Sequence, residues 1–206
     1  MKIKDIQTKI VNAEMRNWVF VKVITDSDIY GWGEATVEWK TRAVAGAIED
    51  LKPLLVGKDP RNIKQNFQIM TKHGFWKMGV IGMTAISGIE HALWDILGKS
   101  LNAPVWQLLG GKVRDKIKIY THLGLGDMQA VYKDTLETSK LNDHAMSLVN
   151  NGYNYFKVVF IPFTHYTNSI DNLKKVNALM SSLRETVGDK IDIMVDFHGR
   201  CGSGIS

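Results

Sequence analysis

Residues 153–199, YNYFKVVFIPFTHYTNSIDNLKKVNALMSSLRETVGDKIDIMVDFHG, decide the fold class of this chain. The first ten and the last ten of these residues are rich in β-branched and aromatic types, whereas 169–188 has helical spacing and ends in a glycine. A strand, a helix and a second strand of these lengths are typical of a parallel βαβ unit with a right-handed crossover. A strand-like run at 115–124 and a helical segment at 138–152 precede them, so we expect three parallel strands within residues 116–206.

Residues 1–115 follow a different pattern, in which β-rich runs come first and helical periodicity follows. Residues 2–36 hold three such runs separated by polar and glycine-containing turns, which predicts a small three-stranded meander. The following segment has apolar residues at helical spacing, with Asp59 as the expected N-cap of the second helix and Pro60 at its first position. We expect an α+β domain whose helices span 41–55, 59–73, 82–101 and 103–111.

Composition and charge limit the classes of protein to which this chain can belong. Apolar residues make up 45% and charged residues 23% of the 206 residues, an ordinary globular composition. Cys201 is the single cysteine, which excludes an internal disulfide framework and favours a reducing cytoplasm. The net charge of +5 is spread along the chain, and the sequence shows neither a signal peptide nor an apolar run of membrane-spanning length. We therefore expect a cytoplasmic protein that binds neither nucleic acid nor membrane.

Asp196 and His198 are the strongest candidates for chemistry. Side chains two apart on a strand point to the same face, and in parallel βα architecture the reactive groups lie at the carboxyl ends of strands. A carboxylate is a hard oxygen ligand suited to Mg²⁺, and an imidazole exchanges a proton near neutral pH. The alternative is an aspartate that caps the next helix beside a solvated histidine.

Three motifs resemble those of a known family. They are GWGEA at 31–35, IEHALWDILGKSLNAPVWQLLGGKVRDKIKIY at 89–120 and VDFHGR at 195–200. The chain resembles the enolase superfamily, in its mandelate racemase-like branch and specifically its galactonate dehydratase-like sugar-acid dehydratases. The resemblance implies an α+β capping domain at 1–115, followed by a (β/α) barrel of the TIM type with Mg²⁺ in its mouth.

The barrel part is short for such a family. A (β/α) barrel needs roughly 200 to 250 residues, whereas 116–206 provides about three of its eight strands. The resemblance therefore implies an N-terminal fragment of a longer protein, or a reading frame that ended early. We expect such a chain to be inactive alone and prone to associate as a homo-oligomer, because an incomplete barrel exposes a strand edge and an apolar inner face.

The resemblance also implies roles for the two candidates. Asp196 would be the first of three carboxylate ligands to Mg²⁺, and His198 the general acid that protonates a departing hydroxyl. The other ligands and the partner base would come from later strands. Relatives that act as racemases often carry Lys-x-Lys on the second barrel strand, where this chain has Lys157-Val158-Val159. That difference favours a dehydratase, with Lys157 either neutralising a substrate carboxylate or simply reaching solvent from a strand end.

Further candidates for substrate binding lie on expected loops. His122 and His165 follow the first and second barrel strands, where a hydroxyl-rich substrate could find hydrogen-bond donors. Asn17 and Trp18 fall in the capping-domain loop that closes over the substrate in the family. Arg200 could pair with a carboxylate at the mouth. For each of these residues the alternative is an ordinary surface or packing role.

The expected function is that of a Mg²⁺-dependent lyase that dehydrates a small-molecule sugar acid. Such an enzyme removes the proton next to the carboxylate, passes through an enediolate and eliminates the hydroxyl on the next carbon. Three alternatives stay open: a non-catalytic truncated relative, one half of a two-chain enzyme, and a racemase or cycloisomerase of the same superfamily.

Overall fold

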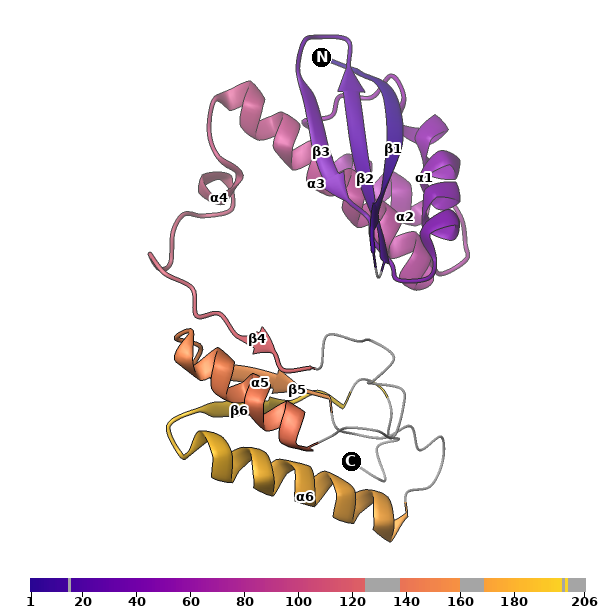
Figure 1. Cartoon of the computed structure of the whole chain (residues 1–206). Helices are drawn as coiled ribbons and strands as arrows, with labels where there is room; N and C mark the ends of the chain where they lie inside the picture. The colour runs from indigo at the N-terminus through magenta and orange to yellow at the C-terminus, as the bar shows by residue number, and fades with distance from the viewer. Residues whose placement is uncertain (15, 125–137, 160–168, 198, 200–206) are drawn as a thin grey trace. The chain divides into compact units, whose positions relative to one another are not determined.

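The computed structural model of the chain describes residues 1–14, 16–124, 138–159, 169–197 and 199 (Figure 1). The chain divides into two compact units, Met1–Asp115 and Lys116–Ser206. Each has a three-stranded sheet and a hydrophobic core of its own.

The sheet of the first unit is the antiparallel meander that the sequence predicted. Its strands lie in the order β1-β2-β3 and span Ile3–Ala13, Arg16–Thr25 and Tyr30–Glu34. Alternate residues of β2, namely Val19, Val21 and Val23, are fully buried, so this face packs into the core. Trp18 and Phe20 alternate with these valines and lie on the other face. Trp18 is 44% exposed, and its ring lies edge-on to that of Phe20, with 6.2 Å between the two ring centres.

Four helices follow the sheet, close to the predicted ranges: α1 (Thr41–Leu55), α2 (Ile63–Lys72), α3 (Gly79–Leu101) and α4 (Val105–Leu108). The predicted apolar stripe of α1 is buried, and so is that of α3. Burial of these stripes against one face of the meander provides the main hydrophobic stabilisation of the unit.

Glycines bring β3 and α3 into backbone contact. A Cβ built on Gly31 would lie 2.0 Å from the carbonyl oxygen of Ala92, and one on Gly33 would lie 1.9 Å from that of Gly88. The carboxylate of Asp95 fixes the approach, because its Oδ2 accepts a hydrogen bond from the Trp32 backbone N–H at 2.9 Å. The small residues Gly88 and Ala92 of α3 thus allow the close packing of this helix against β3.

Helix α3 is also long and apolar enough to cross a membrane, judged by length and composition alone. The sequence alone indicated no apolar run of that length. In the structure the helix is the centre of the first unit, and Ile86, Ile89, Leu93 and Ile96 are fully buried in its core. Packing against β2 and β3 accounts for its hydropathy.

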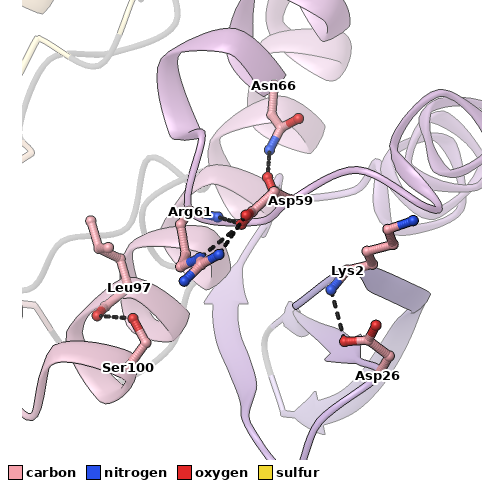
Figure 2. A network of polar contacts seen from close by, with 7 residues as sticks. All are labelled: Lys2, Asp26, Asp59, Arg61, Asn66, Leu97 and Ser100. Carbon is pink, nitrogen blue, oxygen red and sulfur yellow. Dashed lines mark hydrogen bonds and ion pairs between the residues drawn. The ribbon is translucent and has the colours of Figure 1, made fainter.

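Asp59 stabilises a turn and is not the N-cap of α2, which begins at Ile63, three residues after the predicted first position. Its Oδ1 accepts hydrogen bonds from the backbone N–H and the Nε of Arg61, at 2.9 and 3.0 Å (Figure 2). Its carbonyl oxygen accepts a bond from Asn66 Nδ2 at 2.9 Å. The aspartate competes for nearby backbone donors and so forms a local turn before the helix.

This turn gives a pH-dependent contribution to stability. Hydrogen bonds from the Arg61 side chain lower the pKa of Asp59 to about 2. Because the folded-state pKa lies below the unfolded value, the contribution is fully present above about pH 4 and is lost as pH falls towards 2. Asp59→Asn should therefore lower the urea midpoint at pH 7, and the difference from the parent should vanish near pH 2. A difference that is independent of pH would show that the charge of Asp59 contributes nothing.

The second unit contains the predicted parallel sheet, with strand order β4-β5-β6. Its strands span Thr121–His122, Tyr155–Val158 and Asp192–Val195, and its helices are α5 (Thr138–Asn150) and α6 (Ile170–Val187). The strands are shorter than predicted. In the segment before β4, Ile117 and Ile119 are 78% and 66% exposed, so apolar alternation there does not lead to strand pairing.

Both helices cover the same face of this sheet. Leu141 and Ala145 of α5 and Leu183 of α6 are fully buried in one core with Phe156 and Val158 of β5. The helices also contact each other, since Asn142 Nδ2 donates to Ser182 Oγ at 2.8 Å. Successive right-handed βαβ crossovers place consecutive helices on one side in this way (Figure 1).

Candidate functional site

The candidate site lies on the face of the second sheet that α5 and α6 do not cover. Phe156 and Val158 point into the helix-covered core, so Tyr155 and Lys157, which alternate with them, project to the opposite face. Ile193 packs on the same core, which places Met194 on the open face beside Lys157.

Strand register brings three of the predicted residues to one end of this face. His122 pairs with Lys157 across β4 and β5, and Lys157 pairs with Met194 across β5 and β6. Asp196 comes directly after β6, and its backbone N–H donates to the Val158 carbonyl at 2.8 Å. His122, Lys157 and Asp196 therefore mark the carboxyl ends of three neighbouring parallel strands, the usual place for reactive groups in this architecture.

Lys157 and Asp196 form an ion pair across β5 and β6. The Lys157 Nζ lies 3.1 Å from Asp196 Oδ2, and the two side chains are 30% and 26% exposed. The same Nζ lies 5.8 Å from the centre of the Tyr120 ring. A partly desolvated ammonium and carboxylate, next to an aromatic ring, can bind an anionic group or a cation respectively.

Tyr120 was missed by sequence reasoning, although its position two residues before His122 was a usable signal. Sequence reasoning also missed a contact between a lysine and an aromatic ring. The Lys118 Nζ lies 4.7 Å from the ring of Tyr155, whose hydroxyl raises the pKa of this lysine. Since Tyr155 precedes Lys157 by two residues, this contact lies on the same open face, nearer the amino ends of the strands.

The described residues of this site provide one ligand that is suited to Mg²⁺. Asp196 offers the hard carboxylate oxygen that Mg²⁺ prefers, but its described neighbour at 3.1 Å is an ammonium. Within the described ranges no three histidine, cysteine, aspartate or glutamate side chains come together as a metal site. Asp196 can thus contribute to a magnesium site without forming one by itself.

The other predicted site residues are placed differently or fall outside the described residues. Asn17 and Trp18 were expected in a loop and instead belong to β2, which starts at Arg16 and pairs with β1. His122 was expected on a loop and is instead the last residue of β4. The remaining candidates, His165, His198 and Arg200, lie outside the described residues.

A family model matches most of the first unit of the chain. The model describes the N-terminal domain of mandelate racemase and muconate lactonizing enzyme, and it matches residues 1–110. The chain belongs to this family, within the enolase superfamily. The predicted superfamily and the predicted order of domains, a capping domain and then a partial parallel strand–helix region, are both confirmed.

Solved structures of the superfamily match both units. A member of the enolase superfamily from Salmonella Typhimurium is 29% identical, with a TM-score of 0.87 over 97% of this chain and 55% of its own. A Mesorhizobium loti protein provisionally named a dehydratase is 31% identical, with a TM-score of 0.85 over 98% of this chain and 54% of its own. An enolase from Pantoea ananatis with bound D-gluconate and Mg is 28% identical, with a TM-score of 0.82 over 98% and 54%. The chain thus spans about half the length of these family members.

Proposed function

We propose that this chain is the N-terminal part of a Mg²⁺-dependent sugar-acid dehydratase of the galactonate or gluconate type. The observation that carries the proposal is the Lys157–Asp196 pair at the carboxyl ends of parallel strands in a member of this family. The dehydratase name given to the Mesorhizobium loti protein and the D-gluconate and Mg bound to the Pantoea ananatis protein support it. The single lysine at 157–159 favours dehydration over racemisation.

The proposed reaction takes place at two neighbouring carbon atoms of the substrate. A base removes the proton from the carbon next to the carboxylate, and the electron pair forms an enediolate. The C–O bond on the next carbon then breaks, and its hydroxyl leaves as water with a proton from His198. The resulting enol tautomerises to a 2-keto-3-deoxy acid. Bound Mg²⁺ would supply charge stabilisation for the enediolate oxygens.

The chain's own residues have distinct roles in this proposal. Asp196 contributes one oxygen ligand, and Lys157 neutralises negative charge at the substrate carboxylate. His122 donates a hydrogen bond to a substrate hydroxyl from the end of β4. The remaining binding contacts are assigned to Asn17, Trp18, His165 and Arg200.

The same proposal covers the architecture, assembly and cellular location of the enzyme. We place the second unit in a (β/α) barrel of the TIM type, in a cytoplasmic homo-oligomer that binds neither nucleic acid nor membrane. The single cysteine and the dispersed charge of the chain support this setting.

The test is a screen of acid sugars with the protein that contains this chain in its source. Samples with Mg²⁺ are incubated with galactonate, gluconate and their stereoisomers, and 2-keto-3-deoxy products are detected with semicarbazide. Formation of such a product, abolished by EDTA, is expected for at least one sugar acid. Exchange of the substrate α-proton with solvent, without loss of hydroxyl from any sugar acid, would instead identify a racemase.

A further inference from the structure

We propose that the outer face of the first sheet is a two-fold interface between two copies of this chain. The outer face is the side of the β1-β2-β3 meander that lies opposite the core shared with α1 and α3. The inference rests on the homo-oligomer of the proposed function and names the surface that forms it. It uses neither Lys157 nor Asp196, so its test is independent of dehydration.

Aromatic side chains occupy the outer face at β3 and β2. A Cβ built on Gly31 or Gly33 would collide with α3, so Tyr30 and Trp32, which alternate with these glycines, project to the outer face together with Phe20. Tyr30 and Trp32 are 42% and 40% exposed, and their rings lie edge-on with 6.5 Å between the ring centres. Rigid aromatic side chains offer a large contact area at low conformational cost and are enriched in protein interfaces.

The charges of the outer face are complementary to those of a second copy. Strand register places Lys9, Phe20 and Glu34 in one row across β1, β2 and β3. A two-fold axis along β2, between two facing sheets, would place β1 of each copy opposite β3 of the other. Each Lys9 would then face Glu34 of the second copy, while the two Phe20 rings meet at the centre.

Both ends of this row can make the contact. Packed sheets lie about 10 Å apart, a gap that an extended lysine and an extended glutamate can bridge together, and aligned sheets keep their strands within about 30° of each other. Lys9 and Glu34 are exposed, and neither has an ion pair within the part of the chain that the structure describes. Glu34 Oε1 accepts a hydrogen bond from Thr36 Oγ1 at 2.7 Å, which holds the carboxylate in place.

Lys22, the other cation on β2, is accommodated within a single copy. Its Nζ lies 4.1 Å from the centre of the Tyr30 ring and 5.4 Å from that of Trp32. Because both rings belong to β3, these cation–π contacts draw the ammonium away from β2 and from the two-fold axis. The two copies of Lys22 are thereby kept apart.

Exchange of the two charges tests the interface. We would measure the self-association of the whole chain by sedimentation velocity at low ionic strength and micromolar concentrations, where the parent should be a dimer. Lys9→Glu and Glu34→Lys each place like charges opposite one another and should raise the dimer Kd about tenfold or more. The double variant Lys9→Glu/Glu34→Lys restores opposite charges and should return the Kd to within about threefold of the parent.

A matched variant separates this contact from a general effect of charge, and circular dichroism verifies that each protein is folded. Lys64 is exposed on α2, away from the outer face, so Lys64→Glu should leave the Kd within about twofold. A monomeric parent, association that neither single variant weakens, or a double variant as weak as the single ones would overturn the interface. None of these results bears on dehydration, which the screen of acid sugars tests separately.

Discussion

Replacing Gly33 with valine is expected to unfold the first unit of the chain. A Cβ at this position would lie 1.9 Å from the carbonyl oxygen of Gly88 and 3.0 Å from Cβ of His91. Neither the backbone of β3 nor that of α3 can move away, because both are held in the core and joined by the Trp32–Asp95 hydrogen bond. Overpacking of this kind costs about 1–3 kcal/mol in ordinary cores, and a collision with backbone costs more.

Tryptophan fluorescence can follow this unit alone during urea unfolding. All six tryptophans lie within residues 1–115, at positions 18, 32, 39, 76, 94 and 106. The parent should give a cooperative transition, whereas Gly33→Val should show an unfolded-like emission maximum before urea is added. The total stability of a small domain is about 5–15 kcal/mol, so a loss of several kcal/mol is decisive.

Gly46→Ala is the matched control for the glycine experiment. Gly46 lies inside α1, and nothing is found within 4 Å of a Cβ built there. Alanine should stabilise the helix by about 0.5–1 kcal/mol and raise the urea midpoint. If Gly33→Val unfolded at the parent's midpoint, the close approach of β3 to α3 would not be a real constraint.

If the proposed function holds, Asp196→Asn and His198→Asn should impair dehydration by the protein that contains this chain, at different steps. Loss of the general acid should slow formation of the keto acid by about 10²–10⁴-fold. Proton abstraction does not need that acid, so His198→Asn should still exchange the substrate α-proton in deuterated water. Asp196→Asn removes the proposed metal ligand and should lose both exchange and dehydration.

The two readouts come from the same reaction mixture. Proton nuclear magnetic resonance follows loss of the α-proton signal, and the semicarbazide reaction follows the keto acid. Lys118→Met serves as the control on the open face and should keep both rates. If His198→Asn lost exchange and dehydration in equal measure, His198 would act in proton abstraction and the proposed division of roles would be wrong.

Local sequence signals were enough to predict much of the fold. Apolar residues at helical spacing predicted the bounds of α1 correctly, and the helix buries Val44, Ile48, Leu51 and Leu55, because this spacing is set by the helix itself. Asp59 was misplaced for a physical reason. An aspartate before a helix looks the same in sequence whether it caps the helix or accepts hydrogen bonds in the turn before it, and Arg61 decides the outcome here.

The candidate site was predictable only in part, because it depends on strand register. Alternation along one strand places neighbouring candidates on a common face, but it does not say which residue of the next strand lies beside them. The pairing of His122 with Lys157 and the ion pair of Lys157 with Asp196 come from register between strands that are far apart in sequence.

The most direct test of this account is a Mn²⁺ titration of the protein that contains this chain, followed by nuclear magnetic resonance of its histidine rings. A cation at Asp196 would be about two strand spacings, roughly 10 Å, from His122 on β4. His144 belongs to α5, which covers the opposite face of the sheet. The account predicts strong broadening of the His122 signals while those of His144 stay sharp. Broadening of His144 with sharp His122 signals would contradict it.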